Sequence, residues 1–189
     1  MQENQRYGLL SSDEIIRQGL ITPALDRQSD EDPSYGVSPY GYDIRLGDEF
    51  IEWKGRSLEL DPLAIEEDDY MRVRVIDVGP DITIPPHGFL LGHSVEWISL
   101  PDDITGLVKD KSTYARCGIA VQNTVLEAGW SGQITLEITN HNSIPVKLYI
   151  GRGIAQVVFF KSPYKTSYPY RGKYMGQKGV VLPRHRNMV

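Results

Sequence analysis

The sequence predicts an all-β domain, built as a closed barrel or as a jelly-roll sandwich. Three observations support this prediction. Short runs of β-branched and aromatic residues recur along the chain, prolines and glycines separate many of these runs, and apolar and polar residues alternate within them. Many short strands with regular turn signals are typical of barrels and sandwiches. The 189 residues are enough for one domain with a proper hydrophobic core, so residues 1–189 are expected to form a single unit.

One helix is expected before the strands. Ser11 or Ser12 can cap it, and Asp13 and Glu14 place negative charge at the positive end of its dipole. Its apolar stripe consists of Leu10, Ile15, Ile16 and Leu20. Gly19 and Pro23 end it. The polar segment 26–43, which is rich in glycine, proline and tyrosine, is expected to be a long loop.

From about residue 43 the pattern changes to short strands. Turn-forming residues separate many of them, for example Pro85-Pro86-His87-Gly88 and Gly151. The expected strands cover residues 43–46, 49–53, 72–78, 82–84, 88–99, 105–109, 119–122, 133–140, 146–149 and 154–160. Residues 172–189 are expected to form a mobile tail, because glycines and basic residues recur there without a period.

Composition favours a cytosolic protein. Hydrophobic residues make up 40% of the chain and charged residues 24%, and no apolar run approaches the ~18 residues that cross a bilayer. The N-terminus does not have the pattern of a secretory signal. The single cysteine, Cys117, excludes an internal disulfide and is expected to be a small core residue. The net charge of −5 argues against a basic surface for a nucleic-acid polymer.

The motifs for several kinds of chemistry are missing. Four histidines and one cysteine give no pair with metal-ligand spacing, and a zinc deaminase would need a His-x-Glu and a Pro-Cys-x-x-Cys pattern. The sequence also contains no P-loop and no G-x-G-x-x-G motif. We therefore expect no metal held by the protein itself.

The strongest local signal is the segment "KDKSTYARCG" at residues 109–118. Lys111, Ser112, Thr113 and Arg116 are crowded there in a mostly β chain. Ser112 or Thr113 can start a short helical turn, whose free N–H groups attract phosphate. The hydroxyls and the two cations would add donors. The alternative is an ordinary capped turn with solvated charges.

A second signal is the strand "GWSGQITLE" at residues 129–137. Ile134 and Leu136 alternate with Thr135 and Glu137, so the polar residues share one face. That face either meets solvent, as an isolated glutamate usually does, or forms the wall of a pocket. Trp130, before the strand, is either a core aromatic or a platform for a sugar. The tail segment "YPYRGKYMGQKG" is either a disordered end or a lid that orders over a ligand.

Taken together and in order, these segments resemble the dCTP deaminase family, relatives of the trimeric dUTPases. The matching pieces are "SPYGYDIRLG" (38–47), "DKSTYARCGI" (110–119), "LEAGWSGQITLEITN" (126–140), "GIAQVVFF" (153–160) and "GKYMGQKGVVLPR" (172–184). The resemblance implies a dUTPase-like antiparallel β fold, a homotrimer with active sites between subunits, and hydrolysis of dCTP to dUTP and ammonia. It also implies that no metal is bound by the protein and that Mg²⁺ arrives on the triphosphate.

The resemblance also assigns roles to residues. It implies that Glu137, Ser112 and Arg116 are catalytic. Substrate contacts are implied for Lys111, Ser112, Thr113, Tyr114, Ala115, Arg116, Glu127, Trp130, Thr135, Leu136, Gln156, Tyr168, Lys173 and Gln177. Tyr170 competes with Tyr168 as the tyrosine of the lid.

Two departures from the family pattern concern the segment 117–129. This loop is shorter than in other members, and Glu127 and Ala128 stand where Asp and Pro are usual. These changes bear on base recognition. Glu127 also leaves open a bifunctional enzyme that goes on to hydrolyse dUTP to dUMP and diphosphate. A second alternative is a non-catalytic nucleotide-binding trimer on the same fold, because a fold does not guarantee an activity.

Overall fold

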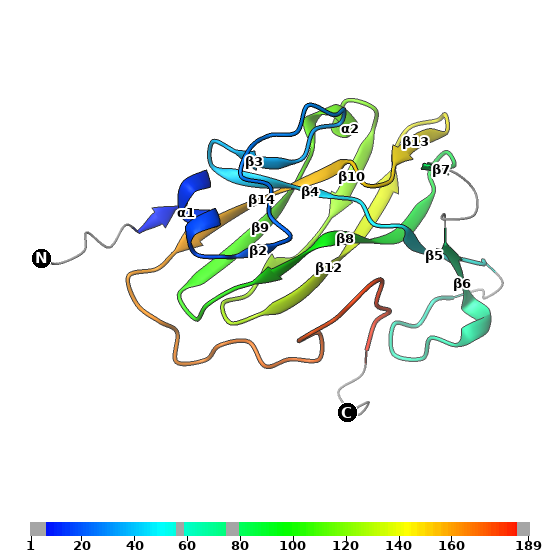
Figure 1. Ribbon diagram of the computed structural model, residues 1–189. Helices are drawn as coiled ribbons and strands as arrows, with labels where there is room; N and C mark the ends of the chain where they lie inside the picture. Colours follow the sequence, from blue (N-terminus) through cyan, green and yellow to red (C-terminus); the bar gives the residue numbers. More distant parts are fainter. Residues whose placement is uncertain (1–6, 56–58, 75–79, 185–189) are drawn as a thin grey trace, which may run out of the picture.

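The computed structural model describes residues 7–55, 59–74 and 80–184, and it is mainly β. Two six-stranded sheets face each other, and a two-stranded ribbon lies at one end (Figure 1). All strand pairs are antiparallel among the described residues. The expected all-β class is therefore confirmed, in the sandwich form.

The first sheet has the order β11-β9-β14-β4-β3, and β1 also pairs with β14. Its strands are β1 (Gly8–Leu9), β3 (Gly36–Ser38), β4 (Gly41–Arg45), β9 (Ile104–Asp110), β11 (Val125–Leu126) and β14 (Gly153–Lys161). The long central strand β14 pairs with β9 on one side and β4 on the other.

The second sheet has the order β10-β12-β8-β5-β6, and β2 also pairs with β8. Its strands are β2 (Ile21–Thr22), β5 (Glu49–Trp53), β6 (Tyr70–Arg74), β8 (Phe89–Ser99), β10 (Ile119–Gln122) and β12 (Ser131–Asn140). The separate ribbon joins β7 (Asp81–Ile84) to β13 (Val146–Tyr149).

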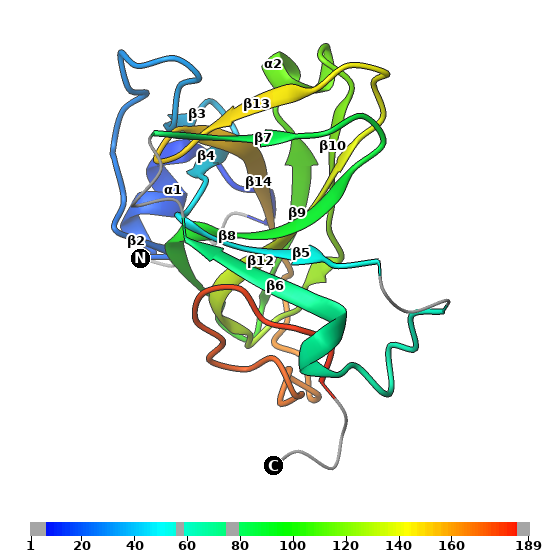
Figure 2. The same ribbon diagram turned by 90° about the vertical axis from the view of Figure 1, so that its right-hand side faces the viewer.

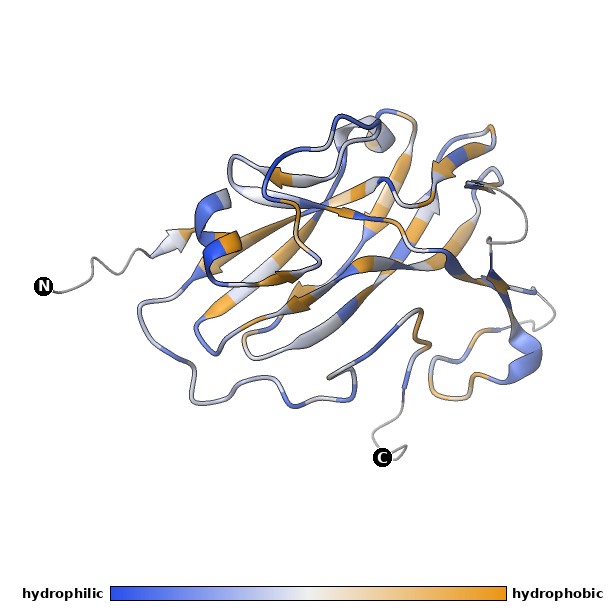
Figure 3. Cartoon of the chain, in the orientation of Figure 1, coloured by the Kyte–Doolittle hydropathy of each residue, from blue (hydrophilic) through white to orange (hydrophobic). Residues whose placement is uncertain are grey.

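The core lies between the two sheets. Tyr42 and Phe159 from the first sheet and Phe50, Leu136 and Ile138 from the second are fully buried there. Apolar and polar residues alternate along the strands, as the colouring in Figure 3 shows. This alternation leaves one face of each sheet apolar, so burial of the two apolar faces against each other holds the sandwich together.

The helices are short. Helix α1 covers Ser12–Arg17 and begins after Ser11, as expected, and Glu14 completes a capping box with Ser11. Helix α2 covers Ser112–Ala115, which confirms the helical turn, although no side chain caps it and its N-cap position is Lys111. A 3₁₀ turn, η1 (Glu67–Asp69), precedes β6 and was not expected.

The structure corrects three expectations. The segment 26–43 is not all loop, because β3 and the start of β4 form a tight hairpin in it. The expected strand 72–78 begins earlier, at Tyr70, and its residues 75–78 lie outside the described part of the chain. Cys117 is exposed, because it follows α2 in a turn instead of lying in a strand.

None of the helices in the described ranges combines the length and hydrophobicity needed to span a membrane.

A buried ion pair joins the two sheets. Arg45 of β4 donates from its Nε to Glu96 of β8 at 2.7 Å, and its backbone N–H donates to the other carboxylate oxygen at 2.8 Å. The Glu96 side chain is completely buried, and that burial raises its pKa, while the contacts with Arg45 oppose the rise. The Arg45 guanidinium also lies 4.9 Å from the centre of the Tyr35 ring.

We expect Arg45→Met to lower the free energy of unfolding by about 3–5 kcal/mol, because it leaves a buried carboxyl group without its cation. The double variant Arg45→Met/Glu96→Leu removes both charges and should recover most of that loss. Urea unfolding of both variants at one protein concentration measures the difference. A double variant no more stable than Arg45→Met would contradict this account.

Candidate active site

Strand β12 places its polar residues on the outer face of the second sheet. Leu136 and Ile138 point into the core, whereas Thr135, Glu137 and Thr139 alternate with them and are half-buried. β10 ends opposite Glu137, because Gln122 is the last residue paired with β12. Beyond Glu137, toward Ser131, β12 therefore stays paired with β8 at one edge and has no strand of the described residues at its other edge.

Glu137 has a strongly perturbed carboxyl group. Its pKa is raised from 4.5 to about 7, mainly because burial removes water from the charged form. Its backbone hydrogen bond and a hydrogen bond from Asn123 oppose that rise. A carboxyl group with this pKa accepts and returns protons near neutral pH, which an ordinary glutamate does poorly.

Asn123 is a member of the site that the sequence did not single out. Its Nδ2 donates to Glu137 Oε2 at 2.6 Å and to the carbonyl of Thr135 at 2.7 Å. The signal for it was its place in the shortened segment 117–129, which departs from the family pattern. That segment alone did not indicate which side chain turns toward Glu137.

The C-terminal tail runs along the outer face of β12. The backbone N–H of Gln133 donates to the carbonyl of Gln177, and the Gln177 side chain donates back to the carbonyl of Gln133, at 2.9 and 2.8 Å. The backbone N–H of Val181 reaches Thr135 Oγ1 at 3.2 Å. Val180 of the tail closes a small apolar cluster with Ile51 and Leu91. The tail is thus packed on the sheet, while its mobility stays a prediction.

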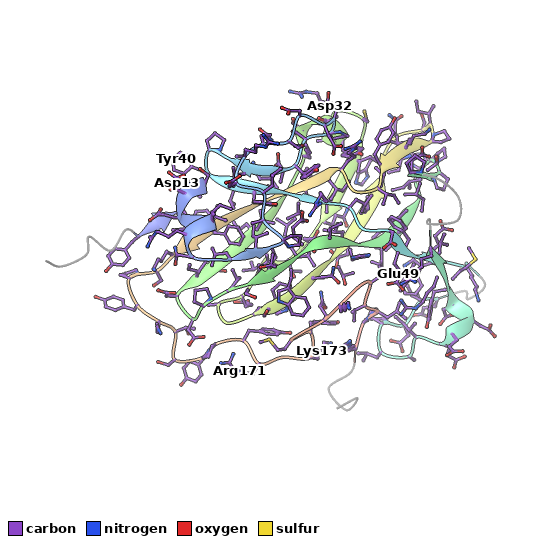
Figure 4. The ribbon with its side chains drawn as sticks, in the orientation of Figure 1. Asp13, Asp32, Tyr40, Glu49, Arg171 and Lys173 are labelled. Carbon is purple, nitrogen blue, oxygen red and sulfur yellow. The ribbon has the colours of Figure 1, made fainter. Side chains whose placement is uncertain are left out.

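Strand β12, the tail and the segment after β10 enclose a pocket. Six of the predicted site residues line it: Glu127, Trp130, Thr135, Glu137, Lys173 and Gln177. The Trp130 side chain is nearly buried, and its Nε1 donates to the carbonyl of Tyr174 at 3.0 Å. Figure 4 labels Arg171 and Lys173 on the tail below the sheets, and both contribute positive charge to the pocket wall.

Most of the other predicted residues form a second group at the opposite end of the sandwich. Helix α2 carries Ser112, Thr113, Ala115 and Arg116, which are exposed. Figures 1 and 2 both place α2 far from the C-terminal tail. None of the residues from Lys111 to Arg116 lines the pocket of the same chain. A single chain therefore does not bring Ser112 and Arg116 to Glu137.

Lys111 is fixed by neighbours in the first sheet. Its Nζ lies 2.6 Å from Asp43 Oδ2 and 3.3 Å from Ser34 Oγ, and both charged side chains are largely buried. Gln156 is paired with Asp43 across β14 and β4, and its side chain donates to Ser38 Oγ at 2.8 Å. The ammonium group of Lys111 thus holds the start of α2 against the sheet.

Three predicted contacts have side chains placed elsewhere. The Leu136 side chain is in the core, so only its backbone faces the outer surface. Tyr114 is buried, and its hydroxyl accepts from the backbone N–H of Tyr149 at 3.0 Å. Tyr168 is 92% exposed, whereas Tyr170 lines the pocket and its hydroxyl accepts from the backbone N–H of Tyr174. Within one chain, the geometry favours Tyr170 as the tyrosine of the lid.

The family model for dCTP deaminase-like proteins matches residues 11–162, which include β12 and α2. This chain belongs to the dCTP deaminase-like family. It is 41% identical to a dCTP deaminase of Azotobacter vinelandii, over 93% of this chain and 98% of that relative. It is 42% identical to a dCTP deaminase of Acidiphilium cryptum, over 91% of this chain and 94% of that relative.

The dCTP deaminase-like fold is also found among solved structures. The crystal structure of 2'-deoxycytidine 5'-triphosphate deaminase from Agrobacterium tumefaciens matches with a TM-score of 0.61 at 18% identity. The match covers 82% of this chain, and this chain spans 48% of that one. This similarity concerns the fold alone, and it confirms the β architecture expected of the family.

In the described ranges of this dCTP deaminase-like chain, no three His, Cys, Asp or Glu side chains are grouped so that they could hold a metal ion.

The raised pKa of Glu137 predicts a pH-dependent stability. Between about pH 4.5 and about pH 7 the folded state keeps a proton that the unfolded state has lost, so the free energy of unfolding falls as pH rises. Glu137→Gln removes this contribution, which amounts to about 3 kcal/mol over the window. Urea unfolding should show that the free energy of unfolding of the variant, relative to that of the wild type, is higher near pH 8 than near pH 5.

The exposed residue Glu67 provides the control, since the free energy of unfolding of Glu67→Gln should depend on pH as that of the wild type does. Parallel pH dependences of the wild type and Glu137→Gln would show that Glu137 titrates normally.

Proposed function

We propose that this chain hydrolyses dCTP to dUTP and ammonia, with Glu137 as the group that moves protons. The observation that supports this most directly is the buried Glu137 carboxyl in the pocket, with its pKa raised to about 7. Membership of the dCTP deaminase-like family supports the choice of substrate. The substrate is dCTP with the Mg²⁺ ion that its triphosphate carries.

In the proposed reaction, the Glu137 carboxylate takes a proton from water as the water oxygen attacks C4 of the cytosine ring. The pKa of free water is near ~15.7, so attack without a base is slow. The carboxyl group passes this proton to N3, and it then moves the hydroxyl proton of the tetrahedral intermediate to the amino group, so that the C4–N bond breaks, ammonia leaves and a carbonyl forms at C4. Ser112 holds the water and the amino group, and the Arg116 guanidinium stabilises the charge that develops on the tetrahedral intermediate.

The division of the predicted residues into two groups supports a homotrimer with shared sites. One group, around Glu137 and Trp130, lines the pocket, and the other, on α2, projects from the opposite end of the same chain. We propose that α2 of one subunit completes the pocket of its neighbour. Each trimer then has three sites, and the ion pair of Lys111 with Asp43 keeps the start of α2 in place.

Glu137→Gln should abolish ammonia release from dCTP and leave dCTP binding largely intact, because the amide keeps the shape of the side chain but accepts no proton from water. The loss should be about 10²-fold or more, as for other general bases. Ammonia release, with dUTP, dUMP and diphosphate measured in the same samples, tests both the activity and its product. Glu67→Gln is the matched carboxylate control. A Glu137→Gln variant with near wild-type turnover would overturn the proposed role.

The shared site predicts complementation between inactive variants. Glu137→Gln and the double variant Ser112→Ala/Arg116→Ala should each be inactive. Mixed trimers, formed by refolding the two together, should regain activity, because some sites then contain an intact Glu137 from one subunit and an intact α2 from the next. Mixtures that remain inactive, although mixed trimers are seen by native mass spectrometry, would show that both groups act within one subunit.

A further inference from the structure

Asn123 lies at the point where the chain passes from one sheet to the other. β10 belongs to the second sheet and β11 to the first, and residues 123–124 connect them. The backbone pairing of β10 with β12 stops at Gln122, opposite Glu137. The Asn123 side chain then continues along β12 in place of a strand, since it reaches the carbonyl of Thr135.

The orientation of the Asn123 amide is determined by its neighbours. Thr135 O and Glu137 Oε2 lie 2.7 and 2.6 Å from the same amide atom, and a carbonyl oxygen only accepts. That atom must therefore be the NH₂ group, which has two hydrogens for the two acceptors. One side chain thus ties the Glu137 carboxylate to the backbone of its own strand.

The oxygen of the Asn123 amide lacks a hydrogen-bond donor among the described residues. Asn123 Oδ1 is buried, and in the described part of the chain no donor reaches it. A buried acceptor without a partner costs folding free energy, and an apolar side chain at this position would avoid the cost. Fold stability therefore explains the amide poorly, whereas its bonds to Thr135 O and to the Glu137 carboxylate explain it as a group that positions Glu137.

We propose that Asn123 is a positioning residue that holds the Glu137 carboxylate in the orientation needed for proton transfer. This inference rests on the proposed function. It adds to the site a residue that acts through Glu137, without contact with the cytosine ring. Because the amide donates to the charged form of the carboxyl group, it also favours that form over the protonated one.

No other side chain among the described residues near Glu137 holds its carboxylate by a hydrogen bond or an ion pair. Its neighbours across the strands are Gln122 on β10 and Leu91 on β8, and both are uncharged. The charged residues on the pocket wall are Glu127, Arg171, Lys173 and Arg184. None of these four makes a hydrogen bond or ion pair with Glu137 among the described contacts, and the perturbation of its pKa includes no charged neighbour.

The test is the pH dependence of kcat in Asn123→Val. Without the donor, the pKa of Glu137 should rise, so the acid limb of the profile should move up by about one pH unit. Near pH 7, kcat should fall about five-fold, KM for dCTP should stay within about two-fold, and raising the pH should restore much of the rate. Gln122→Ala removes the adjacent side-chain amide, which makes no hydrogen bond to the Glu137 carboxylate among the described contacts, and should leave the acid limb in place.

Asn123→Asp is the second variant, because it preserves the shape of the side chain if Asn123→Val fails to assemble. An aspartate cannot donate when ionised and adds a like charge, so its acid limb should move at least as far upward. An unmoved acid limb in a folded variant, or a loss of kcat that is equal at every pH, would overturn the positioning role. Such a result, with Glu137→Gln still inactive, would leave the proposed deamination intact.

Discussion

The site depends on one constraint, which is that β12 must serve two environments at once. Its inward residues fill the core between the sheets, and its outward residues meet the tail and the pocket. Since side chains alternate strictly along a strand, packing of Leu136 and Ile138 inside fixes Glu137 outside. The hydrophobic core therefore sets the direction of the reactive carboxyl group, and a one-residue slip of β12 would bury it among apolar side chains.

Burial of Glu137 comes from parts of the chain that are distant in sequence. Val181 and Gln177 of the tail bond to Thr135 and line the same pocket as Glu137. Leu91 of β8 pairs with Glu137 across the strands, and Asn123 of the connection after β10 donates to its carboxylate. Burial raises its pKa, and the backbone hydrogen bond of Glu137 and the donor of Asn123 limit the rise, so the balance between them sets the pKa near neutrality.

Much of the architecture could be predicted from the sequence. The alternation of apolar and polar residues indicates which side of a sheet each residue faces, and turn residues indicate where the strands end. The strands near residues 49–53, 119–122 and 146–149 were expected with their observed bounds. The two-residue strands β1, β2 and β11 were not expected, since so few residues carry no periodic signal and their pairing depends on neighbours far along the chain.

The site could be predicted less completely. The alternation around Glu137 by itself favours solvent, where an isolated glutamate usually lies, and only the resemblance to a family favoured the pocket. Asn123 had no local signal, because it meets Glu137 only where the crossover after β10 returns to β12. For the lid tyrosine, the sequence left Tyr168 and Tyr170 in competition. Cys117 was misplaced for a similar reason: a turn after α2 looks like a strand when the helix is only four residues long.

The path of the chain between β14 and the pocket has a consequence for how nucleotides enter and leave. Residues 162–168 cross the surface as an exposed strap, and Tyr164 and Tyr168 are almost bare. Few contacts anchor this strap, whereas the tail beyond it is held mainly by hydrogen bonds to β12. Mobility of the tail stays a prediction, and detachment of this segment alone would cost only a fraction of the free energy of global unfolding, because the pairing within both sheets does not depend on it. Passage of nucleotides would then leave the sandwich intact.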